Sequence, residues 1–160
     1  MQKILIIDDE AHIREVLVSY LIREGFQTIE AENGRAGVQL ARAYLPDLIL
    51  SDIRMDGFDG YAALAAIRYQ PLTSTIPVVL MTGQPDEEGR RFAMELGADD
   101  YLIKPFALPT MLAAIRVQLK KHEAIRRQAL HLKAVNAQRV EETLESEAAP
   151  GTSAGHFLPV

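Results

Sequence analysis

Short apolar segments alternate with longer amphipathic ones along most of this 160-residue chain. The short segments are rich in β-branched residues. Their nearly continuous apolar character predicts strands that are buried on both faces of a sheet. The predicted strands are Ile4 to Ile7, Phe26 to Ala31, Leu48 to Leu50, Val78 to Met81 and Tyr101 to Ile103.

Between these segments, apolar residues recur at helical spacing. The predicted apolar stripes are Ile13, Val16, Leu17, Tyr20 and Leu21; Ala36, Leu40, Ala41 and Tyr44; Tyr61, Leu64, Ala65 and Arg68; Phe92 and Leu96; and Leu108, Leu112, Ile115 and Leu119. Gly25 and Gly97 stand where helix C-cap glycines are expected. Five β-α units in a row predict an α/β fold, in which helices cover both faces of a five-stranded parallel sheet.

The last predicted helix continues beyond the repeated units. From Leu108 to about Glu147 the chain has no glycine, and its one proline, Pro109, lies in the first turn, where proline is tolerated. We therefore predict a domain over residues 1–121, a helical extension over residues 122–147 and a flexible tail over residues 148–160.

The composition excludes several classes of protein. The net charge of −5 argues against a general polyanion binder, and the absence of cysteine excludes disulfides and thiolate zinc sites. No segment has the roughly 18 apolar residues of a membrane span, and the first residues lack a signal-peptide core. We therefore expect a cytoplasmic protein with neither a membrane nor a nucleic acid as its partner.

Polar side chains follow four of the predicted strands. Asp8 and Asp9 follow the first strand, Asp52 the third, Thr82 the fourth and Lys104 the fifth. The carboxyl ends of parallel strands meet at one edge of the sheet, so these side chains are expected to lie together. Three neighbouring carboxylates repel one another unless a cation binds, and Mg²⁺ prefers such hard oxygen ligands. A metal, an ammonium and a hydroxyl around one carboxylate suit phosphoryl transfer to that carboxylate.

Each of these residues also has a structural interpretation. An aspartate at the end of a strand often caps the following helix, and a single threonine or lysine is usually a solvated surface residue. The combination at one sheet edge favours the chemical interpretation over these separate ones.

Four motifs in this order resemble the receiver domains of two-component response regulators, the chemotaxis-Y-like family. The motifs are Lys3 to Glu10, Asp52 to Met55 with Asp59-Gly60, Pro77 to Gly83, and Gly97 to Phe106. The resemblance covers about residues 2–121. It implies a doubly wound, flavodoxin-like sheet with strand order 2-1-3-4-5. It also implies a signalling domain, rather than a turnover enzyme, that a sensor histidine kinase or a phosphotransfer protein phosphorylates.

The resemblance further implies roles for individual residues. The metal ligands would be Asp8, Asp9, Asp52 and the main-chain carbonyl of Arg54. Asp52 would accept the phosphoryl group, while Thr82 and Lys104 bind its oxygens. Thr82 and Tyr101 would form the conformational switch, although a strand tyrosine is also ordinary core packing. The Lys104-Pro105 peptide bond is expected to be cis, as in the family.

The predicted extension has three interpretations. Residues 120–133 are basic and residues 141–147 are acidic, as in a solvated helix with a charge gradient. Ile125 and Leu132 lie seven residues apart, which is also typical of a weak coiled-coil homodimer. A nucleic-acid patch is the third interpretation, but no recognised binding motif accompanies it. The alternative function is therefore an unphosphorylated receiver-like scaffold that dimerises through this helix, and the downstream target is not specified.

Two enzyme classes on related folds fit the sequence less well. A haloacid-dehalogenase-type phosphatase would have an aspartate where this chain has Arg54. A flavodoxin-like flavin carrier would have a hydroxyl-rich loop after the first strand, where this chain has Asp8, Asp9 and Glu10.

Overall fold

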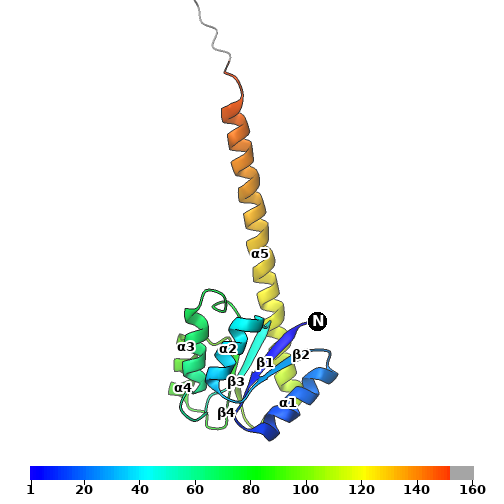
Figure 1. The fold of residues 1–160 in the computed structure, drawn as a ribbon, viewed down its shortest axis with the longest axis vertical. Coiled ribbons are helices and arrows are strands. Elements are labelled where there is room, and N and C mark those ends of the chain that lie inside the picture. The colour runs from blue at the N-terminus through cyan, green and yellow to red at the C-terminus, as the bar shows by residue number, and fades with distance from the viewer. Residues whose placement is uncertain (152–160) are drawn as a thin grey trace, which may run out of the picture. The chain divides into compact units, whose positions relative to one another are not determined.

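The computed structural model describes residues 1–151 and confirms the alternating order of strands and helices (Figure 1). The elements are β1 (Lys3–Ile7), α1 (Ala11–Arg23), β2 (Gln27–Ala31), α2 (Gly34–Tyr44), β3 (Leu48–Asp52), α3 (Gly60–Tyr69), β4 (Val78–Thr82), α4 (Glu87–Glu95), β5 (Asp100–Ile103) and α5 (Leu108–Ala148). All neighbouring strands are parallel, and their order is β2-β1-β3-β4-β5. The predicted flavodoxin-like topology is therefore confirmed.

The sheet separates two hydrophobic clusters. Because successive side chains of a strand point to opposite faces, β1, β3, β4 and β5 each contribute to both clusters, whereas β2 contributes only to the first of the two described here. Leu5 and Ile7 of β1 pack with residues of α2, α3 and α4. Ile4 and Ile6 pack with residues of α1 and the first turns of α5. Figure 1 shows the same division, with α2, α3 and α4 on one side of the sheet and α1 on the other.

The prediction that the strands are buried on both faces is correct for the central strands β3 and β4 and wrong for the edge strands β2 and β5. Every residue of β3 and β4 is buried. In the edge strands, by contrast, Glu30 of β2 and Ile103 of β5 are exposed. An edge strand has a neighbour on one side only, and helices cover it less completely.

The predicted apolar stripes of the helices include residues at their margins that are exposed rather than buried. Val16, Tyr44 and Phe92 are 42%, 54% and 48% exposed. The buried face of α3 consists of Gly60, Ala63, Leu64 and Ile67 rather than of the predicted stripe, and Ala65 is exposed. Glycine and alanine contribute little to an apolar pattern, yet they let a helix approach the sheet closely, and Tyr61 and Arg68 then lie at the half-buried rim of the face.

Helix α5 has residues in two units: the first is Met1–His122, and the second begins at Glu123. In the first unit it buries Met111, Leu112, Ile115 and Leu119. From Glu123 onward every residue of the helix is exposed. The helix ends at Ala148, and the predicted tail lies outside the described residues from 152 onward. Within residues 1–151 none of the helices has the length and apolarity that crossing a bilayer requires.

Candidate functional site

Main-chain hydrogen bonds continue the sheet ladder just beyond the strands and bring the predicted polar residues level with one another. The amide of Ile53 donates to the carbonyl of Met81 at 2.9 Å, and the amide of Lys104 donates to the carbonyl of Thr82 at 2.7 Å. The amide of Asp8 donates to the carbonyl of Ala31 at 3.1 Å. These bonds position the residues that follow β1, β3, β4 and β5 at one edge of the sheet.

Lys104 joins the two buried carboxylates of this edge. Its Nζ lies 3.3 Å from Oδ2 of Asp8 and 3.4 Å from Oδ1 of Asp52. Asp8 is 0% exposed and Asp52 is 5% exposed, whereas Asp9 is exposed. The Lys104-Pro105 peptide bond is cis, as predicted. The predicted lysine and aspartates thus meet at one point, although they are far apart in the sequence.

Asp8 does not cap the helix that follows it. The N-cap of α1 is Glu10, whose side chain makes no capping hydrogen bond. Oδ1 of Asp8 accepts from the amide of Glu10 at 2.9 Å, and Nη1 of Arg14 donates to the main-chain carbonyl of Asp8 at 2.7 Å. These bonds hold the Asp8 side chain in the loop and leave its other oxygen beside Lys104. The capping interpretation of Asp8 is therefore wrong.

The electrostatic balance of the site favours a divalent cation. The pKa of Asp52 is raised to about 6, chiefly because the carboxyl is buried; Lys104 lowers this pKa in part, and nearby Asp8 adds to the increase. One carboxylate oxygen from each of Asp8, Asp9 and Asp52 lies within 4.8 Å of the others. The Lys104 ammonium thus pairs with two of these three carboxylates, Asp8 and Asp52. These hard oxygens fit Mg²⁺, which takes few protein ligands and retains several waters.

A cavity of about 370 Å³ opens next to these carboxylates. It is lined by Asp9, Ile53, Arg54, Met55, Asp56, Asp59, Tyr61, Thr82, Gln84 and Asp86. The Thr82 side chain is nearly buried, and its hydroxyl accepts from the amide of Gln84 at 3.1 Å. Of the predicted set, Asp9, Arg54 and Thr82 therefore border a space large enough for a phosphoryl group.

Tyr61 lines this cavity and was not predicted as a site residue. Its hydroxyl donates to the carbonyl of Gly89 at 3.3 Å, and its ring meets Phe92 edge-on with 5.0 Å between centroids. Tyr61 thereby connects α3 to α4 beside the cavity. In the sequence it counted only as part of an apolar stripe. Tyr101 is 9% exposed and packs in the core cluster on the same face of the sheet. The switch role of Tyr101 stays a prediction.

Comparison with known proteins agrees with this geometry. Residues 4–116 match the family model described as the response regulator receiver domain. The phosphate regulon transcriptional regulatory protein PhoB of Shigella flexneri is 36% identical over 137 residues, which cover 82% of this chain and 60% of that protein. The probable transcriptional regulator ycf27 of Guillardia theta is 37% identical over 120 residues, or 75% of this chain and 46% of that protein. The chain thus spans about half the length of the curated relatives it matches.

Solved structures of receiver proteins superpose on the chain. The chemotaxis protein CheY4 of Vibrio cholerae matches with a TM-score of 0.70 at 28% identity, covering 72% of this chain and 97% of that one. The signal receiver domain of a histidine kinase from Syntrophus aciditrophicus matches with a TM-score of 0.70 at 35% identity, covering 76% and 92%.

These comparisons bear on two expectations from the sequence: that nucleic acid is not a partner, and that the chain resembles the receiver domains. Proteins described as transcriptional regulators do not support the expectation that nucleic acid plays no part, and this expectation is withdrawn. The second expectation is the resemblance to response-regulator receiver domains, and the family match over residues 4–116 confirms it. The chain belongs to the response regulator receiver domain family.

Proposed function

We propose that this chain is a phosphorylation-switched receiver in which Asp52 accepts a phosphoryl group from a sensor histidine kinase or a phosphotransfer protein. The observation that carries this proposal is the pairing of a buried carboxylate, Asp52, with the Lys104 ammonium at 3.4 Å, beside Asp8 and Asp9. In the transfer, a carboxylate oxygen of Asp52 forms a bond to phosphorus, and the bond between phosphorus and the donor's imidazole nitrogen breaks.

Each residue of the site has a role in this transfer. The Lys104 ammonium neutralises charge on a phosphoryl oxygen, and the Thr82 hydroxyl donates a hydrogen bond to another. The residues that would hold Mg²⁺ are Asp8, Asp9, Asp52 and the main-chain carbonyl of Arg54. When bound, the cation supplies positive charge that offsets the negative charge of the carboxylates and the phosphoryl group. The domain acts on itself and does not turn over substrate like an enzyme.

The output of the proposed switch is a change in population. The acyl phosphate favours the active form of a two-state domain, in which Thr82 and Tyr101 take new positions. A cytoplasmic location is part of this proposal, and the downstream target stays unspecified. The intact set of Asp8, Asp9, Asp52, Thr82 and Lys104 does not favour an unphosphorylated scaffold.

Phosphorylation with acetyl phosphate tests the proposal directly. In the presence of Mg²⁺ the wild-type chain is expected to gain the mass of one phosphoryl group in intact-mass spectrometry. Chelation of the metal and the Asp52→Asn substitution should each abolish that gain. A wild type that gains no mass and also fails to bind beryllofluoride, a stable mimic of the acyl phosphate, would contradict the proposal. Beryllofluoride binding without an adduct would indicate rapid hydrolysis instead.

An apolar groove next to the acceptor is suited to the helix of a phosphoryl donor. It has a volume of about 480 Å³ and is lined by His12, Ile13, Val16, Leu17, Gly83, Lys104, Pro105, Phe106 and Leu108. Lys104 belongs both to this groove and to the Asp52 pair. Any donor must bring its phosphohistidine to Asp52, so an apolar helix face seated here would deliver it to the correct edge of the sheet.

Substitution in the groove should separate donor docking from chemistry. Val16→Glu is expected to slow phosphotransfer from a phosphorylated histidine kinase about tenfold, because it places a charge in an apolar contact. Ile22→Glu is the matched control, since Ile22 is an exposed apolar residue of the same helix outside the groove. Both variants should react with acetyl phosphate at the wild-type rate. Equal slowing of kinase transfer in both variants would argue against docking in the groove.

A further inference from the structure

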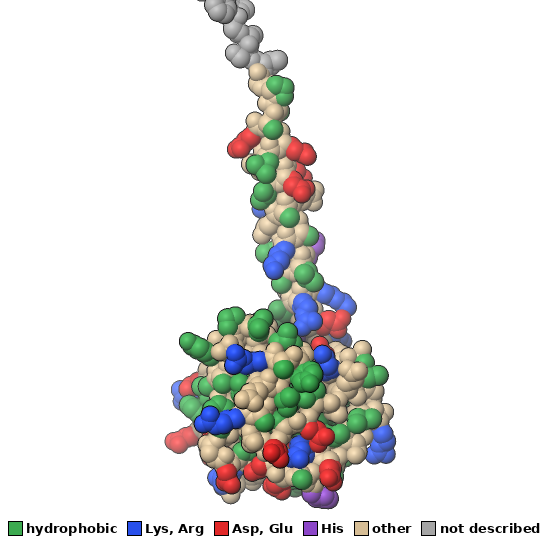
Figure 2. Space-filling view, in the orientation of Figure 1, with side chains coloured by type: hydrophobic (Ala, Val, Ile, Leu, Met, Phe, Trp, Pro, Cys, Tyr) green, Lys and Arg blue, Asp and Glu red, His purple; other side chains and the backbone are tan. Residues whose placement is uncertain are grey.

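The loop between β1 and α1 consists of three acidic residues, Asp8, Asp9 and Glu10, and is called the acidic loop below. It lies at the lower end of the receiver, where β1 leads into α1 (Figure 1), and Figure 2 shows acidic side chains gathered at that end with basic ones among them. Neighbouring carboxylates repel one another. The main chain of the acidic loop therefore needs support from outside the loop to keep one shape.

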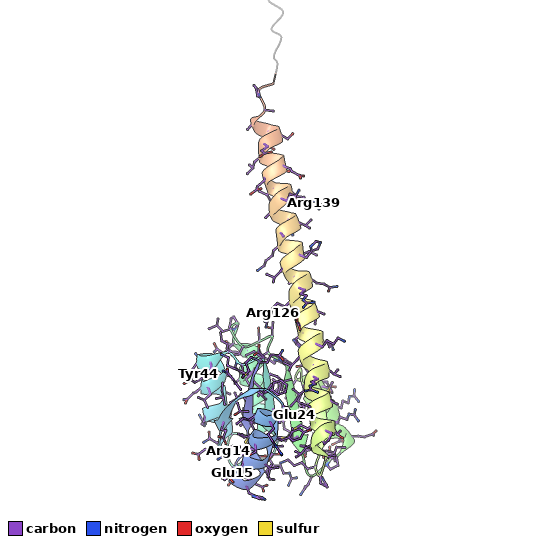
Figure 3. All side chains as sticks on the ribbon, turned by 90° about the vertical axis from the view of Figure 1, so that its right-hand side faces the viewer. Arg14, Glu15, Glu24, Tyr44, Arg126 and Arg139 are labelled. Atoms are coloured by element: carbon purple, nitrogen blue, oxygen red, sulfur yellow. The ribbon has the colours of Figure 1, made fainter. Side chains whose placement is uncertain are left out.

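Arg14, the fourth residue of α1, supports the main chain of the acidic loop at both of its ends (Figure 3). Its Nη1 donates to the carbonyl of Asp8 at 2.7 Å, and its amide donates to the carbonyl of Glu10 at 3.0 Å. The Arg14 side chain is only 16% exposed. These two bonds fix the main chain on either side of Asp9.

Glu30 of the edge strand β2 fixes the Arg14 guanidinium in turn. Its Oε1 lies 3.3 Å from Nε of Arg14. A guanidinium is planar and directs its donors along fixed lines, so contacts through both Nε and Nη1 determine its orientation. A lysine would carry the same charge without this fork. Arg14 therefore links the acidic loop to β2 in one defined geometry.

A support of this kind affects which cation the site prefers. Groups behind metal ligands orient those ligands and tune the affinity for the metal. Mg²⁺ demands a nearly ideal octahedron, whereas Ca²⁺ accepts irregular ligand arrangements. A rigid acidic loop would therefore favour Mg²⁺, and a loose one would lose that preference. The positive charge of Arg14 repels both divalent cations alike, so the charge alone does not create a preference between them.

We propose that Arg14, held by Glu30, is a positioning residue that makes the cation site selective for Mg²⁺ over Ca²⁺. It acts through the acidic loop, chiefly through the main chain of Asp8. The proposal rests on the proposed function, because it requires the cation site of Asp8, Asp9 and Asp52.

NMR titration of the full, metal-free chain with Mg²⁺ and with Ca²⁺ tests the proposal. Arg14→Lys is expected to weaken Mg²⁺ binding about tenfold and Ca²⁺ binding at most about twofold, so the selectivity falls about fivefold. Arg14→Gln should lose as much selectivity, although it also removes a positive charge. Arg23→Lys is the matched control, because it makes the same substitution at an exposed residue in the last turn of α1 and should leave both affinities unchanged.

Glu30→Gln tests the link from the other side. Alone it should lower the selectivity about threefold, and in the Arg14→Lys background it should have no further effect, because the two residues act as one unit. Equal weakening of both cations by Arg14→Lys would show a general loss of structure and overturn the proposal, as would tighter Mg²⁺ binding by Arg14→Gln. A wild type that binds both cations equally well would overturn it too. A wild type that binds neither would refute the cation site itself, and this proposal with it.

Discussion

Without divalent metal, Asp52→Asn is expected to raise the free energy of unfolding at pH 7 by about 3 kcal/mol. The reason is the cost of keeping the Asp52 carboxylate ionised in a buried position, which raises its pKa from 3.8 to about 6. At about 1.4 kcal/mol per pH unit, this difference corresponds to roughly 3 kcal/mol. Asparagine removes the charge, and its oxygen still accepts from the amide of Ile53, as Oδ1 of Asp52 does at 3.0 Å.

The sign of this effect follows from proton binding. Below pH 3.8 the Asp52 carboxyl is protonated in both folded and unfolded chains, so it does not contribute. Between pH 3.8 and about 6 the unfolded chain releases its proton first, and the stability of the wild type falls as the pH rises. Above that range, the destabilisation that the ionised Asp52 carboxylate causes no longer changes with pH. The stability difference between variant and wild type should therefore be small at pH 4 and full at pH 7.

Urea unfolding in a chelator, at pH 4 and pH 7, measures this difference. Added Mg²⁺ should stabilise the wild type more than Asp52→Asn, because a ligand that binds only the folded chain shifts the equilibrium towards it. Equal midpoints for both proteins at pH 7 would show that the buried carboxylate carries no such cost. A Mg²⁺ effect of equal size in both proteins would show that Asp52 is not a metal ligand.

Gly60→Ala is expected to lower the free energy of unfolding by about 3 kcal/mol. Gly60 is the first residue of α3, and its amide donates to the carbonyl of Ile53 at 2.8 Å. A methyl group at Gly60 would overlap the carbonyl oxygen of Asp52 and would lie 2.7 Å from Cα of Ile53. Both are main-chain atoms of the acceptor segment, so the helix start or the strand end must shift. The preference of helices for alanine, about 1 kcal/mol, does not offset this overlap.

Gly83→Ala is the matched control, because an added methyl at Gly83 meets no atom within 4 Å. Its urea midpoint should equal that of the wild type, while the midpoint of Gly60→Ala falls. A Gly60→Ala protein as stable as wild type would mean that α3 moves away from β3 at no cost. In that case the close contact does not define the position of Asp52.

The site residues at strand ends were predictable because one topological rule places them. The ends of parallel strands meet at one edge, so Asp52, Thr82 and Lys104 required only correct strand assignment. The difference between buried Asp8 and exposed Asp9 was not predictable in this way. It arises from the loop hydrogen bonds of Asp8 with Glu10 and Arg14, which depend on the exact path of the chain.

Site residues whose position depends on how closely a helix packs against the sheet were harder to predict. Tyr61 borders the cavity because small residues let α3 approach the sheet closely and because α4 presents the carbonyl of Gly89 to its hydroxyl. Neither condition appears in a periodic apolar pattern. Tyr44 was predicted to belong to the buried stripe of its helix, but it is 54% exposed. An apolar stripe indicates which face of a helix is buried, and it does not indicate where the buried part of that face ends.

The change in surroundings along α5 has a consequence for amide hydrogen exchange. Amides near Ile115 and Leu119 lie on a buried helix face and should exchange only when the whole receiver unfolds. Amides beyond Glu123 belong to turns without a packed face, and in a free monomer they should exchange through local fraying within much shorter times. One uninterrupted helix would therefore show a steep gradient of protection factors. Any molecule that covers the exposed turns should flatten that gradient from the far end inward.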